Sequence, residues 1–480
     1  MEDDLQQGKM STFRTFQMRN LDDLVSRYGL SDDAAQAIRV VGSVLPFKTN
    51  AYVCDELIDW TKVPDDPIYQ LTFPQREMLD AADYETVEAL LRSGADASTL
   101  DCAVDAIRRR LNPHPSAQQK LNVPTLDGAP VPGMQHKYRE TVLLFPAQGQ
   151  TCHAYCTYCF RWAQFVGDAD LRFAAQGVEQ LLDYLRSHPE VTDVLVTGGD
   201  PMVMRSAVLR RYIEPLLDPD FAHVNIRIGT KAPSYWPHRF NTGADADDVL
   251  RLFEQVVSAG RHLAVMAHYS HSRELDTEAA RLAVKRIAST GAVVRGQAPL
   301  IAHVNDDADV WQRLWTTQVR LGVVPYYMFV ERDTGAKRYF EVTLARALDI
   351  YSRAFQQVSG LARTVRGPVM SATPGKVLVD GVVEVGGTKM FALKMLQDRQ
   401  AERANGLFFA RYDEHATWFD QLEPALDGDP SWFPHCMDRT NRTASLVSDE
   451  QLERSRLDSP IPFAMSKVPV RVEITRVSVG

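Results

Sequence analysis

Short apolar runs alternate with amphipathic stretches between about residue 140 and residue 375. The apolar runs have the length of buried strands, and the stretches between them repeat apolar side chains at helical spacing. This alternation predicts repeated βαβ units around a parallel sheet, and about six units fit, too few for a closed eight-unit barrel. The predicted strands cover residues 141–145, 192–197, 223–229, 262–268, 291–296, 324–330 and 364–370. The predicted helices lie near residues 175–187, 205–217, 245–259, 276–289, 307–320 and 341–357.

The segments on either side follow other patterns. Helical spacing dominates before the first strand, a stretch rich in Pro and Gly leads into it, and short strands follow the last unit. The predicted regions are a helical N-terminal region over residues 1–115, an extended connector over 116–139, the partial barrel over 140–375 and a C-terminal appendage over 376–480.

Several short strands are predicted in the appendage. Asp380-Gly381 and Gly386-Gly387 predict tight turns between strands, and residues 468–477 predict a last strand. We expect the appendage to cover the open end or an edge of the barrel.

Composition narrows the class of function. The chain has 480 residues and a formal net charge of −9, which argues against a general nucleic-acid-binding protein. No apolar run approaches the length of a membrane span. The acidic start Met1-Glu2-Asp3-Asp4 is unlike a secretory or transit peptide. We therefore expect a cytoplasmic protein that binds neither nucleic acid nor membranes, and the sequence leaves homo-oligomer formation open.

Three of the six cysteines, Cys152, Cys156 and Cys159, directly follow the predicted strand 141–145. Three thiolates on one loop can bind three irons of a cubane cluster and leave the fourth iron open to a small molecule. Ferredoxin patterns supply four cysteines, because those clusters only transfer electrons. The loop therefore predicts an iron–sulfur cluster that takes part in chemistry.

The same cysteines are also compatible with structural, zinc-binding or redox roles. Buried cysteine often acts as a small apolar residue, and a C-x2-C pair also occurs in zinc and redox sites. Zinc would need a fourth ligand; His153 lies inside the loop, but no second C-x2-C pair exists. A disulfide framework is not typical of a chain of this size with so few cysteines.

The C-x3-C-x2-C spacing, with an aromatic residue before the last cysteine, resembles the signature of the radical S-adenosylmethionine (SAM) enzymes. The surrounding sequence, from about Pro130 to Lys376, resembles the lysine 2,3-aminomutase family. The resemblance implies an α/β fold built on a partial (β/α)6 barrel. It also implies that Cys152, Cys156 and Cys159 hold a [4Fe-4S] cluster, and that SAM binds the open iron and yields a 5'-deoxyadenosyl radical. A reductase, flavodoxin or ferredoxin would supply the electron.

Motifs at the later strand ends resemble the family's SAM-binding positions. Gly198-Gly199-Asp200 resembles the loop that holds the SAM amino group, although such a sequence also suits a plain turn. At two matching positions the chain departs from the family, with Ala267 for Thr and Gly296 for Asn. By resemblance the cofactor-binding residues are Gly198, Gly199, Asp200, Thr230, Lys231, His268 and Gln297.

The family's aminomutases also bind pyridoxal phosphate (PLP) through a lysine in a glycine-rich loop. The corresponding loop here is three residues shorter, and Lys376 would be either the PLP lysine or a solvated turn lysine. Two phosphate-binding arginines of the family become Lys137 and Thr141, and lysine cannot replace the bidentate fork of arginine. Arg139 is expected to compensate. The sequence leaves PLP binding open.

The substrate-binding positions differ as well. Arg161 matches the arginine that pairs with the substrate carboxylate in the family. The two aspartates that hold the distal amine of lysine align with Arg332 and Ser371. We therefore expect an amino acid other than lysine, and a distal acid group, as in glutamate, would suit Arg332 unless Glu331 and Asp333 neutralise it.

The leading hypothesis is a radical SAM enzyme that rearranges an amino-acid-like small molecule, with Arg161 and Lys376 as catalytic residues. The alternative is a PLP-independent radical SAM enzyme that carries out another hydrogen abstraction, such as epimerisation or rearrangement, on a carboxylate-bearing small molecule. A non-catalytic iron–sulfur or zinc scaffold would leave the SAM-loop resemblance without a purpose.

Overall fold

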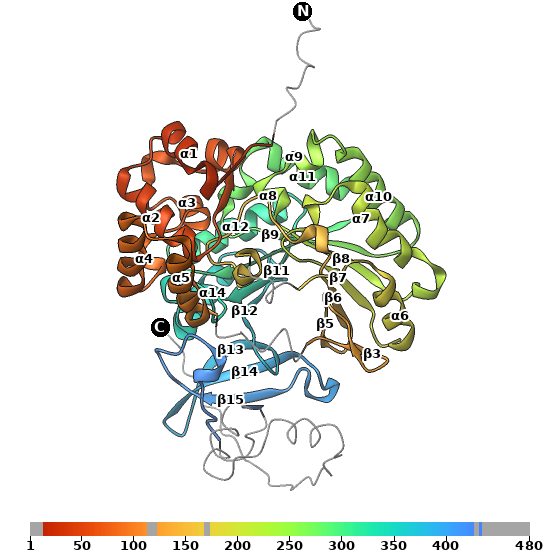
Figure 1. The fold of residues 1–480 in the computed structure, drawn as a ribbon. Helices are drawn as coiled ribbons and strands as arrows, with labels where there is room; N and C mark the ends of the chain where they lie inside the picture. Colours follow the sequence, from red (N-terminus) through yellow and green to blue (C-terminus); the bar gives the residue numbers. More distant parts are fainter. Residues whose placement is uncertain (1–12, 113–121, 168–172, 427–431, 434–480) are drawn as a thin grey trace, which may run out of the picture. The chain divides into compact units, whose positions relative to one another are not determined.

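Seven parallel strands form the centre of an eleven-stranded sheet in the described part of the chain (Figure 1). The computed structural model describes residues 13–112, 122–167, 173–426 and 432–433. The chain divides into two compact units, Met1–Trp432 and Phe433–Gly480, and the description below concerns the first. The strand predicted at 468–477 lies outside the described residues.

The parallel strands occupy the positions that the sequence predicts. Each pairs with the strand that precedes it in the chain, and a helix follows each of the first six. The strands are β6 (Thr141–Leu144), β7 (Asp193–Val196), β8 (Asn225–Thr230), β9 (Leu263–His268), β10 (Val293–Leu300), β11 (Val324–Val330) and β12 (Arg366–Ser371). The six long helices between them are α6 (Glu179–Ser187), α7 (Ser206–Ile213), α10 (Ala246–Ser258), α11 (Glu278–Ser289), α12 (Ala308–Arg320) and α14 (Leu344–Gln356). The mixed α/β prediction is confirmed.

Antiparallel strands extend both edges of this parallel set. β5 (Met134–Tyr138) pairs with β6, and β13 (Gly375–Val385) pairs with β12. Beyond β13 follow β14 (Thr388–Asp398) and β15 (Leu407–Arg411). Among the described residues no strand pairing joins the two edges, so the sheet is not a closed barrel.

The appendage begins with one long hairpin. Gly386 and Gly387 form its turn with φ of 58° and 79°, a conformation that glycine adopts without steric cost. The predicted turn at Asp380-Gly381 is wrong. The pairing with β14 shifts register between Val379 and Gly381, so these residues form an irregularity inside β13.

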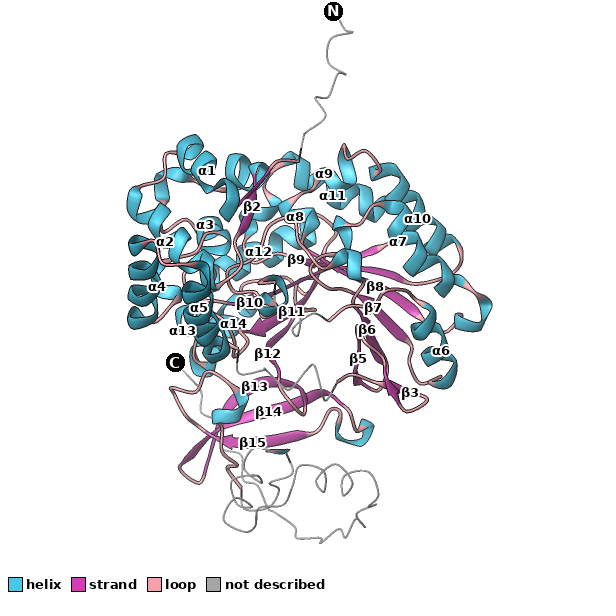
Figure 2. Ribbon diagram, in the orientation of Figure 1, coloured by secondary structure: helices cyan, strands magenta, loops and turns pink. Residues whose placement is uncertain are grey.

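Alternation along the strands separates a helix-facing side from a cavity-facing side. In β10, Val294 and Ala298 are buried in the core beneath the helices, whereas the intervening Arg295 and Gln297 are half-buried on the opposite face. Figure 2 shows α6, α7, α10 and α11 along the outer side of the sheet. The inner face of the sheet therefore presents the polar side chains of these strands.

The N-terminal region has its own apolar core. Besides α-helices it contains a short two-stranded sheet of β1 (Thr15–Gln17) and β2 (Lys48–Asn50), which the sequence did not indicate. Apolar residues of this region pack with Ala154 and Trp162, which lie in and beside the cysteine loop. The helices are α1 (Leu21–Tyr28), α2 (Asp32–Val44), α3 (Pro67–Thr72), α4 (Ala81–Ser93) and α5 (Ala97–Leu111). No helix in the described ranges is long and apolar enough to cross a membrane.

Candidate active site

A cavity of about 310 Å³ lies on the inner side of the sheet, where the loops after the parallel strands meet. Most of the cluster, SAM, PLP and substrate residues that the sequence singled out line this one cavity. They are Cys152, Cys156, Cys159, Arg161, Gly198, Gly199, Asp200, Thr230, Lys231, His268, Gln297, Arg332, Ser371 and Lys376. Segments far apart in the chain are thus brought to one site.

The cysteine loop, residues 151–161, follows β6 and is fastened to the N-terminal region. The amide of Tyr155 donates to the carbonyl of Lys48 (2.8 Å), and the amide of Thr157 donates to the carbonyl of Leu71 (3.0 Å). The side-chain amide of Asn50 donates to the carbonyl of His153 (3.2 Å). The N-terminal region therefore forms part of the site's scaffold, a role for which the sequence carries no motif.

The three thiols of this loop face the cavity and form no disulfide. Burial raises the pKa of Cys159 to about 12 and raises the pKa values of Cys152 and Cys156 above their usual range. Thiols of this kind are poor nucleophiles on their own, and binding of a metal drives their deprotonation. Within the described ranges no three His, Cys, Asp or Glu side chains converge as ligands of a single metal ion. Ligands of a cubane cluster each bind a different iron and need not converge on one point.

The Gly198-Gly199-Asp200 loop lies directly against the start of the cysteine loop. A Cβ on Gly199 would sit 2.5 Å from the backbone nitrogen of Thr151, so no larger residue fits there. The amide of Asp200 in turn donates to the carbonyl of Thr151 (2.7 Å). Glycine at this position is required because two loops of the site touch through their backbones.

The carboxylate of Asp200 joins the ends of β7 and β8. It accepts from the hydroxyl of Thr230 (2.7 Å), the amide of Lys231 (2.9 Å) and the amide of Met202 (2.9 Å). Burial raises the pKa of Asp200 to about 6 despite these bonds. The carboxylate thus orients the two loops and lines the cavity.

Lys231 forms a buried ion pair with Glu274, at 2.5 Å. Glu274 also accepts from the amides of Ser270 (2.6 Å) and His271 (2.9 Å), so it links the loop after β8 to the loop after β9. The sequence indicated Lys231 and missed Glu274, which belongs to no motif. A buried carboxylate with several donors is a positioning group, because losing one partner would leave a buried charge.

His268 and Gln297 are direct neighbours on β9 and β10. The side-chain amide of Gln297 donates to Nε2 of His268 (2.9 Å), which leaves the proton of the imidazole on Nδ1. Burial, together with the positive charges of Lys231 and Arg161, lowers the pKa of His268 to about 3. The imidazole is therefore uncharged at neutral pH and acts as a polar wall of the cavity.

Arg161 is a cation that has no carboxylate partner in the described part of the chain. Its guanidinium lies 4.1 Å from the ring centre of Phe145 and 5.2 Å from that of Phe160, and it forms no hydrogen bond or ion pair with a described residue. Burial lowers its pKa to about 10, so it stays charged at neutral pH. A buried guanidinium between aromatic rings suits a planar anion such as a carboxylate.

Lys376 lies at the start of β13 and its ammonium faces the same cavity. It lies 5.1 Å from the ring centre of Tyr138 and 4.7 Å from that of Tyr327, with no hydrogen bond to a described residue. Burial, reinforced by Arg227 and Arg366, lowers its pKa to about 7. A large fraction of this amine is thus unprotonated near neutral pH, the form that attacks an aldehyde.

Lys137 reaches the cavity from β5. Its ammonium donates to the carbonyl of Ala372 (2.5 Å), in the loop that leads to Lys376. Thr141 also lines the cavity. The expected compensation by Arg139 is wrong, because this residue is exposed in the turn between β5 and β6 and does not line the cavity. Of these three positions only Lys137 places an amine in the cavity, and burial, together with Arg332 and Arg399, lowers its pKa well below the usual range.

Two acids lie beside Arg332 in the chain, and both have raised pKa values. Burial raises the pKa of Glu331 well above its ordinary value and raises that of Asp333 as well. Arg332 lines the cavity and lies 5.2 Å from the ring centre of Phe160, which also borders Arg161. Arg332 therefore places a guanidinium in the cavity wall beside a carboxyl group whose pKa burial raises.

These contacts fit the three groups that the sequence suggested. Three thiols suit a cluster, the glycine backbone that touches their loop suits SAM, and an amine with a lowered pKa suits PLP, and all of them line one cavity.

Comparison with known proteins identifies the family. No family model matches the chain. A protein of Aquifex aeolicus (strain VF5) named "Putative L-lysine 2,3-aminomutase" is 30% identical over 393 residues, which cover 82% of this chain and 91% of that protein. The L-lysine 2,3-aminomutase of Bacillus subtilis (strain 168) is 23% identical over 466 residues, or 92% of this chain and 86% of that enzyme.

Among solved structures, a radical SAM methyltransferase from Sphaerobacter thermophilus matches with a TM-score of 0.33 and 12% identity, over 57% of this chain and 91% of that one. This similarity is too low to support a conclusion, whereas the sequence identity extends over most of both chains. The chain belongs to the lysine 2,3-aminomutase-like family of radical SAM enzymes and is an aminomutase-like isomerase.

Proposed function

We propose that this enzyme moves an amino group between adjacent carbons of an amino acid other than lysine. Membership of the family implies a [4Fe-4S] cluster and SAM, which together supply a carbon radical that abstracts a substrate hydrogen. We assign the cluster to Cys152, Cys156 and Cys159. We also assign the six strand–helix units from β6 to α14 to the family's partial (β/α)6 barrel. Reduced cysteines favour a reducing compartment such as the cytoplasm.

SAM is assigned to the loops after β7 to β10. The backbone of Gly198 and Gly199 allows close approach to the cysteine loop, and Asp200 supports the amine of SAM. Thr230 and Lys231 hold the adjoining loop through Asp200 and Glu274. His268 and Gln297 supply uncharged polar contacts, consistent with the lowered pKa of His268.

Lys376 is proposed to hold PLP, which when bound supplies an electron-accepting ring for the migrating amino group. The observation that carries the proposal is that an unpaired amine with a pKa of about 7 lines the same cavity as the three cysteines and Arg161. Lys137 supports the phosphate, since its side-chain amine lies beside the loop that carries Lys376 and a bound phosphate would favour its protonation. Arg161 holds the α-carboxylate of the substrate and thereby fixes the carbons that face the cluster.

The far end of the substrate is proposed to be acidic. Arg332 replaces a family aspartate, and the neighbouring Glu331 and Asp333 have raised pKa values that limit their ability to neutralise it. An ammonium group placed there would meet a like charge in a partly desolvated site. A carboxylate would form an ion pair, so glutamate and similar acids are preferred over lysine.

The experiment is an anaerobic assay of the reconstituted enzyme with SAM, PLP, a chemical reductant and one amino acid at a time. Mass spectrometry follows 5'-deoxyadenosine and any β-amino acid isomer. The proposal predicts an isomer from an acidic amino acid and none from lysine. A β-isomer of lysine would overturn the substrate assignment, whereas 5'-deoxyadenosine with substrate but equal turnover without PLP would favour the PLP-independent alternative.

A further inference from the structure

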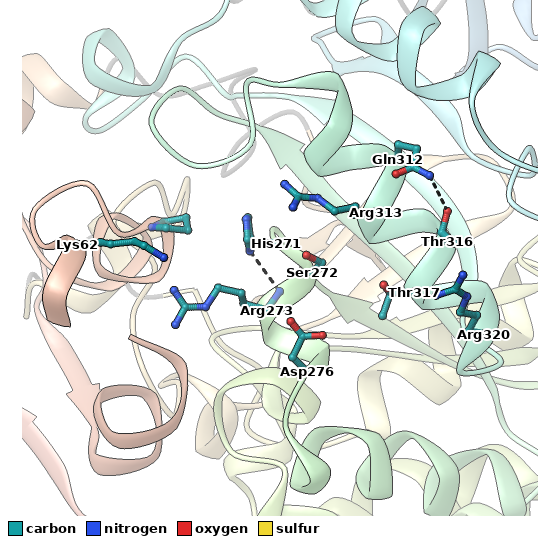
Figure 3. Close-up of a pocket in the computed structure, with 11 residues that line it drawn as sticks. Lys62, His271, Ser272, Arg273, Asp276, Gln312, Arg313, Thr316, Thr317 and Arg320 are labelled. Carbon is teal, nitrogen blue, oxygen red and sulfur yellow. Dashed lines mark hydrogen bonds between the residues drawn. The ribbon is translucent and has the colours of Figure 1, made fainter. Parts of the chain in front are cut away.

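A second pocket, of about 610 Å³, is lined in part by the loop after β9 and shares no lining residue with the candidate active site. We call it the basic pocket, because its lining contains Lys62, Arg273, Arg313 and Arg320 against one acid, Asp276. In Figure 3, Lys62 and Arg313 extend toward the space between them, with His271 and Arg273 lying in between. The remaining lining residues are Pro67, Ser272, Gln312, Thr316 and Thr317.

The positive charge of this pocket comes mainly from α12. Lys62 pairs with Asp59 (2.9 Å) and Arg273 pairs with Asp66, so their charges are partly compensated. Arg313 and Arg320 are exposed, seven positions apart on α12, and form no ion pair with an acid in the described ranges. An uncompensated pair of arginines on a chain with a net charge of −9 creates a local field that attracts acidic partners.

The basic pocket is connected to the cysteine loop by a short series of groups. His271 lines the pocket, and its chain neighbour Ser270 has its hydroxyl 3.1 Å from the hydroxyl of Tyr158. Tyr158 directly precedes Cys159 in the chain. Glu274 holds the segment in place by accepting from the amides of Ser270 and His271. One covalent step and one hydrogen-bonded contact thus separate the pocket wall from the loop of the three cysteines.

We propose that the basic pocket is the docking surface for an acidic flavodoxin-type protein that delivers one electron to the site. The proposal rests on the proposed function, in which the cluster assigned to Cys152, Cys156 and Cys159 must be reduced before SAM is cleaved. The anionic flavin hydroquinone of the donor would lose one electron to become the neutral semiquinone, and the oxidised [4Fe-4S] cluster would gain that electron. A small, polar, charge-steered contact is typical of electron-transfer partners.

The test compares the charge reversals Arg313→Glu and Arg320→Glu, made together, with a control Arg211→Glu. Arg211 is an exposed arginine on α7 and lines neither cavity. Binding of an acidic bacterial flavodoxin to the reconstituted enzyme is measured by titration at low and high salt. Reduction of the cluster by flavodoxin hydroquinone is followed by its visible absorbance, and dithionite serves as a small reductant that needs no docking.

The proposal predicts that the double variant binds flavodoxin about tenfold or more weakly at low salt and is reduced correspondingly slowly. High salt should remove most of the difference, because it screens surface charges. Dithionite-driven 5'-deoxyadenosine formation should match the wild type in both variants, and Arg211→Glu should bind normally.

Equal binding and reduction in all three proteins would overturn the docking site while leaving the proposed function intact. If the wild type reduced with dithionite does not cleave SAM, the proposed function itself is overturned. If inorganic phosphate binds the wild type but not the double variant while flavodoxin binding is unchanged, the basic pocket is a small-anion site and the docking proposal fails.

Discussion

The carboxylate of Asp66 forms an ion pair with the guanidinium of Arg273, which joins the N-terminal region to the loop after β9. The side chain of Asp66 is fully buried and also accepts from the amides of Ile68 (3.0 Å) and Tyr69 (2.9 Å) at the start of α3. The same helix supplies the carbonyl of Leu71, which accepts from the cysteine loop. Asp66 thus caps α3 and also holds α3, and with it the cysteine loop, against the loop after β9.

Asp66→Ala should destabilise the protein strongly, because it leaves Arg273 unpaired and two helix amides unsatisfied. Removing one partner of a buried ion pair costs about 3–5 kcal/mol. The free energy of unfolding, measured by urea titration, should fall by roughly this amount. Asp96→Ala removes a cap of the same kind on exposed α5 and should have a much smaller effect. Equal effects of the two changes would contradict the role assigned to Asp66.

Gly199→Ala should disturb the cysteine loop without unfolding the chain. The added methyl group would lie 2.5 Å from the backbone nitrogen of Thr151, and backbone on both sides leaves little room to relax. We expect a reduced iron content after reconstitution, measured by metal analysis, and weaker binding of SAM. Gly360→Ala is the matched control, since a Cβ there meets no atom within 4 Å. An iron content equal to that of the wild type in Gly199→Ala would show that the close contact between Gly199 and Thr151 is not needed for cluster binding.

Lys376 should form a covalent adduct with PLP that borohydride makes permanent. Peptide mass spectrometry should locate the pyridoxyl group on this lysine, and Lys376→Ala should abolish it. Lys389→Ala, at an exposed lysine of β14, should leave it intact. The pKa of about 7 means that adduct formation slows as the pH falls below about 7, because the protonated amine cannot attack. An adduct on other lysines only would retire amino migration through Lys376.

Arg161→Lys should weaken binding of the amino-acid substrate more than it weakens binding of SAM. A charged hydrogen bond contributes about 1.5–3 kcal/mol, so kcat/KM for the amino acid should fall about tenfold to a hundredfold. The affinity for SAM, measured by titration, should change little if the guanidinium faces the substrate. A large loss of SAM affinity with an unchanged KM for the amino acid would assign Arg161 to SAM instead.

Local sequence patterns located the strands well, because each parallel strand is buried beneath helices and its apolar run ends where the loop begins. For β11 the predicted and observed limits coincide at residues 324 and 330. The cavity residues followed from the resemblance, since the C-terminal ends of parallel strands share one edge.

What the sequence missed are contacts between distant segments. Leu71 and Lys48 hold the cysteine loop through backbone carbonyls, which leave no mark on the side-chain pattern. Glu274 is an ordinary acid in the sequence and becomes a buried anchor only through Lys231. Arg139 was misplaced because a tight turn directs it outward, and Asp380-Gly381 was misjudged because a bulge uses the same residues as a turn.

The most direct measurement of the central claim is 5'-deoxyadenosine formation by the reconstituted enzyme with SAM and dithionite under anaerobic conditions. Three proteins are compared: the wild type, Cys159→Ala and the control Cys102→Ala, an exposed cysteine on α5. Wild type and Cys102→Ala should form 5'-deoxyadenosine, and Cys159→Ala should form none. Unchanged formation by Cys159→Ala would contradict the assignment of the cluster to this loop.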